Sequence, residues 1–295
     1  MKEKKKKTDH LLALIREGRP MTSGEQLRLT VALSVPAIVT QLSAIVMQYI
    51  DAAMVGSLGA NASASIGLVS TTTWLFWGLC AAASTGFSVQ VAHRIGADDW
   101  DCARSILRRS VPSTFAFSAL LAAIGVSVSG ALPQWLGGDS AIRSDASLYF
   151  LIFSLFLPIL QMNFLAAGML RCSGNMRIPS IAGILMCILD VVFNFFLIFP
   201  SREFSAGGLT LSIPGAGLGV QGAALGTGLA ESVAAAITLW YLFTRSSGLK
   251  IKAWRKSPSL PTPPIVRNSI RISLPMGLEH VVICGAQIMT TVIVA

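Results

Sequence analysis

Charged residues are scarce in this sequence. Asp, Glu, Lys and Arg make up 13% of the 295 residues, and 53% of the residues are hydrophobic. A typical soluble domain has about 25% charged residues. A water-soluble protein of this composition would expose large apolar patches and aggregate. The composition therefore indicates a protein whose natural solvent is lipid.

Several chemical motifs are also missing. No G-x-x-x-x-G-K-[ST] stretch is present, which excludes a P-loop ATPase, and the five cysteines form no C-x-x-C pair. The three histidines lack metal-ligand spacing, and no nucleophile–base pair marks an intramembrane enzyme. The net charge of +9 comes from basic residues scattered between apolar runs, which does not favour nucleic acid as a partner. We therefore expect a non-enzymatic protein without a cofactor.

Seven apolar segments are long enough to cross a membrane as helices, which takes about 20 residues each. Alternating patterns typical of short strands are absent between them, and the connection PSREFSAGG is expected to be a turn. The predicted fold is an all-α, polytopic membrane helix bundle. Its predicted spans are 29–57, 64–92, 106–131, 146–170, 179–200, 217–243 and 269–295.

The basic residues predict the orientation of these helices. Of the 23 Lys and Arg residues, only Arg143 and Arg202 lie in the connections on one side. All others lie in the N-terminal tail or in the second, fourth and sixth connections. Because positively charged connections stay in the cytoplasm, we expect a cytoplasmic N-terminus in a multi-pass protein of the cytoplasmic (inner) membrane.

The start of the seventh segment repeats the start of the first. LSVP, ending at Pro36, resembles ISLP, ending at Pro275, but Asp51 then aligns with Thr290. Six helices lie between the two starts, so the repeats would be parallel. The chain ends inside the apolar run TTVIVA, and we expect it to be truncated early in the second repeat.

The predicted organisation follows from these spans and charges. It comprises a cytoplasmic basic tail with an interfacial segment over 1–28, a six-helix N-terminal lobe over 29–243, a cytoplasmic linker over 244–268, and helix 7 over 269–295 as the start of an incomplete C-terminal lobe.

Asp51 interrupts the otherwise apolar stretch VMQYIDAAMVGSLG. A charge near the bilayer centre costs about 3 kcal/mol on insertion scales, so such a residue usually faces a cavity or a partner. Gln41, Gln48 and Asp51 fall on one stripe of a helix, and Gln48 is close enough to hydrogen-bond the carboxyl. The alternative is an interhelical hydrogen bond without a role in transport.

A second carboxylate, Asp190, lies in the fifth segment, CILDVVFNFFLIF, with Asn194 one turn later on the same face. Carboxylates on the first and fifth helices indicate a shared cavity. Such a pair can pass a proton from one side to the other, or bind a monovalent cation such as Na+. This chemistry is typical of ion coupling rather than of bond cleavage.

Three further polar residues lie within apolar segments: Asn163, Glu231 and Glu279. The sequence leaves open whether each belongs to a substrate or coupling site or only to a bond between helices. Pro36, which removes a backbone hydrogen bond, predicts a kink in the first helix.

Four glycines recur around the start of the sixth segment: Gly215, Gly219, Gly222 and Gly226. Their spacing of three and four residues predicts one smooth face for close packing against another helix.

Three stretches resemble the multidrug and toxic compound extrusion (MATE) family. SVPAIVTQLSAIVMQYIDAAMVGSLG is similar to its first helix, with the proline, the later aspartate and the V-G-x-L-G ending. MLRCSGNMRIP is similar to its L-R-x-x-G-[DN]-x-[RK]-x-P connection between helices four and five. ILDVVFNFFLIF and the following GLGVQGAALGT resemble its fifth helix and the entry to its sixth.

The resemblance implies one lobe of a twelve-helix fold and export driven by an H+ or Na+ gradient. Its first-helix aspartate falls on Asp51, its fourth-helix asparagine on Asn163 and its fifth-helix aspartate on Asp190. Many members have an asparagine four residues before that last aspartate, where this chain has Met186. Asn194 lies four residues after it instead, so the amide is kept on the same face at another depth.

The resemblance therefore implies a cation-coupled antiporter that exports amphipathic, often cationic drugs or toxic compounds, as a monomer embedded in membrane lipid. One alternative is a lipid-linked oligosaccharide flippase of the same superfamily. Its anionic substrate calls for Lys or Arg inside the apolar segments, and none lies well inside one here. The other alternative is an inert truncated membrane protein.

Overall fold

The computed structural model describes residues 22–206, 209–246, 248–250 and 262–294, and it is predominantly helical. Within these residues, seven helices are long and apolar enough to cross a membrane, as the sequence predicts. They are α2 (Ser23–Gly56), α3 (Ala60–Gly96), α4 (Trp100–Val128), α6 (Ser140–Cys172), α7 (Arg177–Ile198), α8 (Val220–Thr244) and α10 (Thr262–Val294). The remaining elements are the short helix α5 (Leu132–Trp135) and the strands β1 (Pro200–Ala206) and β2 (Leu209–Ala216).

Several helices extend beyond the predicted apolar spans, and polar residues cap three of them. α2 begins at Ser23, after a capping box in which the Thr22 backbone amide donates to Glu25 Oε2 at 2.9 Å. Asp99 and Asp139 likewise cap α4 and α6. α2 and α10 take in residues that the sequence analysis assigned to the tail and the linker. Of those two segments, residues 1–21, 247 and 251–261 lie outside the described residues.

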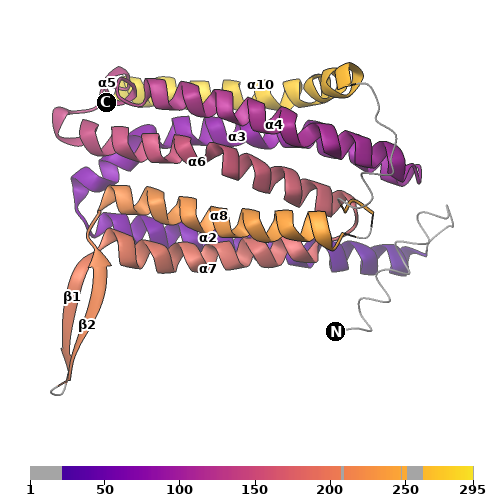
Figure 1. The fold of residues 1–295 in the computed structure, drawn as a ribbon. Helices are drawn as coiled ribbons and strands as arrows, with labels where there is room; N and C mark the ends of the chain where they lie inside the picture. The colour runs from indigo at the N-terminus through magenta and orange to yellow at the C-terminus, as the bar shows by residue number, and fades with distance from the viewer. Residues whose placement is uncertain (1–21, 207–208, 247, 251–261, 295) are drawn as a thin grey trace.

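The connection between α7 and α8 is an antiparallel hairpin, so the predicted turn is wrong. β1 pairs with β2, and Phe204 lies opposite Leu211. The sequence LTLSI at the start of β2 does alternate apolar and polar residues, which is the period of a strand. The pattern was missed because it is short and lies between two long apolar runs. The hairpin projects away from the end of the helix bundle (Figure 1).

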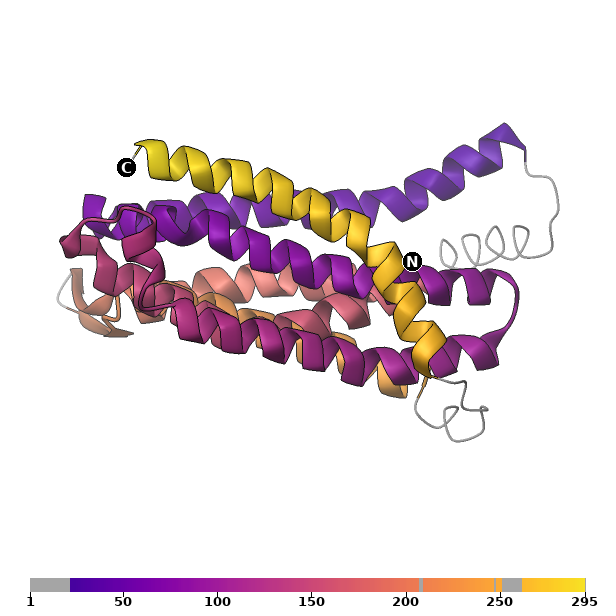
Figure 2. The same ribbon diagram turned by 90° about the horizontal axis from the view of Figure 1, so that it is seen from above.

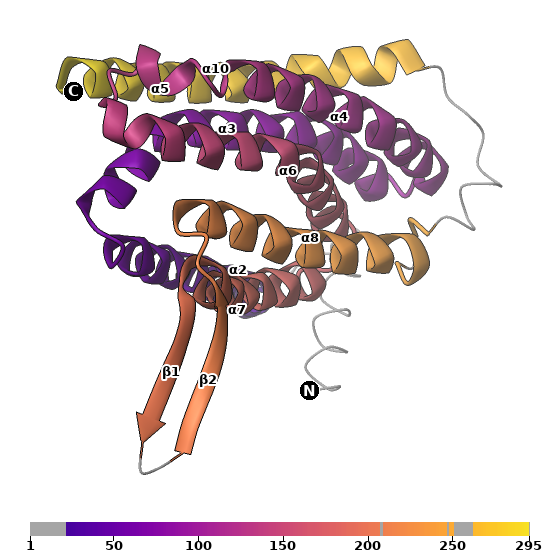
Figure 3. The ribbon, with the colours of Figure 1, turned by 60° about the vertical axis from the view of Figure 1, so that its left-hand side comes forward.

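The helices form two groups, with α3, α4, α6 and α10 on one side and α2, α7 and α8 on the other (Figures 1 and 3). α6 joins the groups, because it packs against α3 and α4 as well as α8. α2 packs mainly against α7 and makes few contacts with α3, which follows it in the chain. The first and fifth membrane helices are therefore neighbours.

Small residues allow the closest helix contacts, as is typical in membranes. A Cβ atom at Gly125 of α4 would lie within 2.9 Å of the Ser154 Cβ of α6. A Cβ at Gly222 of α8 would lie 2.6 Å from the backbone of Leu197 in α7. α8 therefore lies directly against α7 at this point, because Gly222 has no side chain.

The predicted glycine face is only partly correct. Gly222 and Gly226 do contact α7, but Gly215 lies in β2 and Gly219 precedes α8. Gly219 has a φ of 56°, a backbone conformation that glycine adopts without strain. Its role is to turn the chain from the hairpin into α8.

α10 lies along α3, and it crosses the bundle obliquely when seen from above (Figure 2). A Cβ atom at Gly78 of α3 would lie 2.6 Å from the His280 ring of α10. One turn from Gly86, the Gln90 side chain donates to the backbone oxygen of Ile265 at 3.3 Å. α10 is thus attached to α3 by a glycine contact near its middle and by a hydrogen bond near its N-terminus.

Candidate functional site

Asp51, Asp190 and Asn194 form a polar cluster between α2 and α7. The Asn194 side-chain amide donates to Asp51 Oδ1 at 2.9 Å and to Asp190 Oδ2 at 3.2 Å. Asp190 and Asn194 are buried, with 0% and 1% of their surface exposed, and Asp51 is half-buried. A single amide therefore joins carboxyl groups from two helices that are far apart in the chain.

This cluster holds more hydrogen-bond acceptors than donors. Asp190 Oδ1 and Asn194 Oδ1 are buried and accept no hydrogen bond from the described residues. Two ionised carboxylates side by side also repel each other. A proton or a monovalent cation between the two carboxyl groups would reduce their repulsion and would satisfy the buried oxygens. The oxygen atoms of this cluster therefore fit such a cation.

α8 closes the cluster on a third side. A Cβ atom at Gly226 would overlap Asn194 Oδ1, so only glycine leaves room for the amide at this position. The next residue, Thr227, lies beside Asp190. The sequence analysis assigned Gly226 to packing in general, and it gave no signal that the packing partner is Asn194.

A cavity of about 420 Å³ adjoins the cluster, between α2, α3, α6, α7 and α8. Gln48, one turn before Asp51, lines it, and so does Cys187, one turn before Asp190. Thr227 also lines the cavity. The carboxyl groups therefore lie next to one end of this space.

One wall of the cavity is aromatic. The rings of Trp74 and Trp77 on α3 meet edge to face with centroids 5.4 Å apart, and Trp77 meets Phe164 of α6 in the same way at 5.0 Å. The sequence analysis did not select these residues. The spacing of the two tryptophans in STTTWLFWG, which places them on one helix face, was the available signal.

A second polar group lines the cavity where α6 meets α8. The Asn163 side-chain amide donates to Glu231 Oε1 at 2.7 Å, and Asn163 Oδ1 accepts from the Thr238 hydroxyl at 2.9 Å. Among the described residues that line the cavity, Glu231 is the only one with a charged side chain. The sequence analysis named Asn163 and Glu231 but did not foresee that they are partners.

The other predicted site residues lie at varying distances from this cavity. Gln48 lines it, but the described hydrogen bond to Asp51 comes from Asn194. Gln41 is exposed and is not among the residues that line the cavity. Glu279 is exposed on α10, which packs against α3. Pro36 lies inside α2, and its carbonyl accepts a hydrogen bond from the Thr40 hydroxyl at 2.8 Å.

Comparison with known proteins identifies the family. The MatE family model matches residues 36–196, which is more than half of the chain and includes Asp51, Asn163, Asp190 and Asn194. The chain belongs to the MATE family. It is therefore a multi-pass membrane protein of a family of transporters, in agreement with its seven apolar helices.

Two curated relatives match most of this chain. The probable multidrug resistance protein NorM of Thermotoga maritima is 23% identical over 264 residues, which cover 88% of this chain and 53% of the relative. A protein of Shewanella oneidensis named a FAD transporter is 22% identical over 252 residues, or 82% of this chain and 53% of the relative. The chain thus spans about half the length of the curated relatives it matches.

A solved structure supports the MATE fold. An outward-facing structure of a multidrug resistance MATE family transporter superimposes with a TM-score of 0.74 at 22% identity. The superposition covers 89% of this chain and 56% of the other. The helix bundle described above is therefore part of a MATE fold.

Proposed function

We propose that this chain belongs to a cation-coupled antiporter that exports amphipathic, cationic or neutral small molecules. The observation that carries the proposal is the Asn194 amide bridging Asp51 and Asp190. The cluster lies next to a cavity with an aromatic wall and one carboxylate. An antiporter exchanges a cation for an organic substrate, and this exchange requires an ion site and a substrate site that lie next to each other.

The coupling cation, H+ or Na+, would bind between the two carboxyl groups. Binding removes their repulsion and supplies positive charge to the buried oxygens that accept no hydrogen bond. Release restores a negative charge beside the cavity. One charge that moves down a membrane potential of 100 mV provides about 2.3 kcal/mol, which is enough for modest accumulation of substrate on the other side.

The substrate would be held by the aromatic wall and Glu231. Trp and Phe rings attract organic cations over their faces, by about 2 kcal/mol when water is excluded. Of the described residues that line the cavity, none is Lys or Arg, which disfavours an anionic lipid-linked sugar. The same argument disfavours FAD, which carries phosphates and gives one relative its name.

Coupling would pass through α2 and α8. Thr227 beside Asp190 and Glu231 at the substrate lie one turn apart on α8. α2 packs mainly on α7. A change in the charge of the pair Asp51 and Asp190 therefore acts at the main contact that α2 makes. We propose that cation binding changes the packing of α2 around Pro36 and drives the substrate outward, in a cytoplasmic membrane with the N-terminus inside.

A binding experiment on the chain itself tests this proposal. Trp74 and Trp77 line the cavity, so quenching of tryptophan fluorescence reports a ligand there. Tetraphenylphosphonium, an amphipathic cation, is titrated into the chain in lipid nanodiscs at pH 6 and pH 8, with and without Na+. We expect at least tenfold weaker binding when the coupling cation is present, because substrate and cation compete.

The variants Asp51→Asn and Asp190→Asn should bind with an affinity independent of pH and Na+. Glu231→Gln should weaken binding but keep the cation dependence, and Trp77→Phe should reduce the signal. Equal cation dependence in the wild-type chain and in Asp51→Asn would remove Asp51 from the coupling site. In vesicles from cells that express the gene, Asp51→Asn should abolish gradient-driven ethidium efflux.

A further inference from the structure

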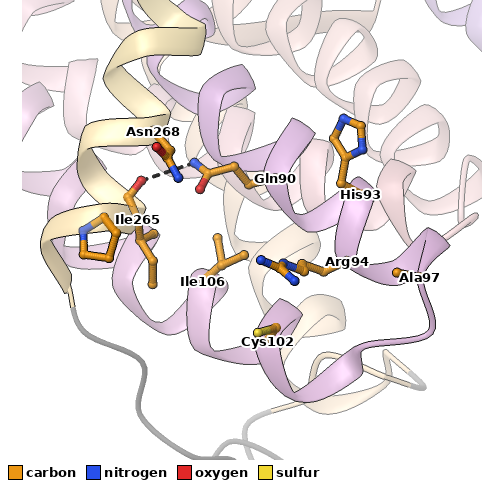
Figure 4. A pocket seen from close by; sticks show the side chains of 9 residues that line it. Gln90, His93, Arg94, Ala97, Cys102, Ile106, Ile265 and Asn268 are labelled. Carbon is orange, nitrogen blue, oxygen red and sulfur yellow. Dashed lines mark hydrogen bonds between the residues drawn. The ribbon is translucent and has the colours of Figure 1, made fainter.

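A second cavity, of about 400 Å³, lies between α3, α4 and α10, away from the acidic cluster. Gln90 and Arg94 of α3, Ile106 of α4, and Ile265 and Asn268 of α10 line it (Figure 4). The Arg94 guanidinium points from α3 toward the space beside Ile106 (Figure 4). Among the lining residues, Arg94 provides a positive charge and Gln90 and Asn268 provide side-chain amides, in contrast to the carboxyl groups beside the first cavity.

The surroundings of this second cavity carry an excess of positive charge. The end of α3 and the adjoining ends of α4 and α10 carry six arginines against three aspartates. Arg94 lies 3.5 Å from Asp99, and Arg104 lies 2.8 Å from Asp101. No ion pair among the described residues is made by the other four, Arg108, Arg109, Arg267 and Arg271. An anion is therefore the complementary ligand for this end of the bundle.

An apolar groove of about 360 Å³ continues along the same three helices. Phe87 of α3 lines the groove one turn from Gln90 of the polar cavity, and Val266 of α10 follows Ile265. On α4 the polar cavity and the groove together run from Cys102 to Phe117. Fifteen residues of helix span about 22 Å, which is more than half of a hydrocarbon core of about 30 Å. The cavity and the groove together are thus long enough for the headgroup and an acyl chain of a lipid in one leaflet.

We propose that one anionic phospholipid binds along this seam. Its phosphate would lie near Arg94 and Asn268, and an acyl chain would fill the groove between α4 and α10. Phosphate oxygens match the guanidinium and amide donors of the cavity. Asp99 holds Arg94 only weakly, because their closest N–O distance is 3.5 Å and both side chains are exposed. A lipid here would bridge α10 to α4, which contact each other little.

Native mass spectrometry of the purified, delipidated chain tests the proposal. The chain is titrated with phosphatidylglycerol, with phosphatidylcholine of the same acyl chains, and with glycerol 3-phosphate. We expect one phosphatidylglycerol to bind at least tenfold more tightly than phosphatidylcholine, because only phosphatidylglycerol has a net negative charge, whereas the choline cation of phosphatidylcholine is repelled by the surrounding arginines. Glycerol 3-phosphate should compete only weakly. Equal binding of the two lipids, or full displacement of phosphatidylglycerol by glycerol 3-phosphate, would overturn the proposal.

Two pairs of variants locate the lipid. Arg94→Gln should reduce the affinity for phosphatidylglycerol about tenfold, whereas Arg108→Gln, which removes the same charge from an exposed site outside the cavity, should not. Gly277→Leu should fill the groove, since a Cβ there lies 3.7 Å from Leu79 without a clash. Gly285→Leu on the same helix has open space and serves as its control.

The stability of the same variants gives a second measurement. Phosphatidylglycerol should raise the melting temperature of the wild-type chain and of the two controls, because a ligand stabilises the state that binds it. It should raise those of Arg94→Gln and Gly277→Leu much less. An equal rise in all five proteins would place the lipid elsewhere, and formation of dimers without bound lipid would assign the groove to a second copy of the chain.

Discussion

α2 and α10 begin alike and have different surroundings. Each is a long apolar helix with a proline near its first third, Pro36 in one and Pro275 in the other. α2 packs on α7, where Asp51 accepts a hydrogen bond from Asn194. The position in α10 that aligns with Asp51 is Thr290, whose exposed hydroxyl donates to Ala286 of its own helix at 3.0 Å. A polar residue on such a helix forms a site only where a second helix supplies the complementary group.

The glycines near these helices show the same contrast. Gly226 of α8 leaves just enough room for the Asn194 side chain, whereas Gly285 of α10 has no other atom within 4 Å of where its Cβ would be. The acidic cluster is therefore closely packed on three sides. Around Gly285, by contrast, the described residues leave open space.

The largest expected effect comes from removing the bridging amide. Asn194→Leu leaves the buried Asp190 carboxyl without its described donor, which should lower the free energy of unfolding by about 2–3 kcal/mol. Thr290→Val on α10 should change it by less than about 0.5 kcal/mol. Unfolding of the chain in mixed micelles with increasing SDS measures both. Similar values for the two variants would contradict the contrast between α2 and α10.

Gly226→Ala tests the packing of the cluster without changing its charge. The added methyl group overlaps Asn194 Oδ1, so we expect a loss of about 1–3 kcal/mol in the free energy of unfolding. The dependence of tetraphenylphosphonium binding on H+ or Na+ should weaken as well, because the amide must move. Gly285→Ala is the control and should be neutral or slightly stabilising. A neutral Gly226→Ala would show that α8 does not hold Asn194 in place.

Gly78→Ala should disturb the contact between α3 and α10 and leave the acidic cluster unchanged. Its Cβ would lie 2.6 Å from the His280 ring, so α10 should shift on α3 at a cost of about 1–2 kcal/mol. Cation-dependent ligand binding should not change, since α10 contributes no residue to the cluster. The double variant with His280→Ala should recover much of the lost stability in a double-mutant cycle. Failure of this rescue would show that the two residues do not meet.

The smallest expected effect concerns the cap of α4. The Cys102 backbone amide donates to the Asp99 carboxylate, which lowers the pKa of Asp99. A lowered folded-state pKa stabilises the fold above the ordinary value of about 4 and ceases to do so as the pH falls through the lowered value. Asp99→Ala should therefore cost about 1 kcal/mol at pH 7. The difference in melting temperature from wild type should shrink as the pH falls below the ordinary value of about 4 and through the lowered pKa of Asp99; a constant difference would exclude the charged cap.

The sequence predicts the membrane helices because each long apolar run has a low free energy only in lipid. It singles out Asp51 and Asp190 because a carboxylate inside such a run is costly enough to indicate a function or a partner. The hairpin was missed because the alternation in β2 covers only the few residues of LTLSI. The contact between Asn163 and Glu231 was missed because the two residues lie 68 positions apart, and no local pattern encodes such a contact.

The sequence by itself determined that this protein lies in a membrane, where its helices are, and which side chains are too polar for lipid. These properties follow from the transfer energy of each segment, which depends only on local composition. The tertiary structure decided that α2 adjoins α7, that Asn194 links two carboxyl groups, and that arginines gather at the end of an apolar groove. Those results depend on which helix faces meet, and side-chain shape and backbone approach across the bundle determine that.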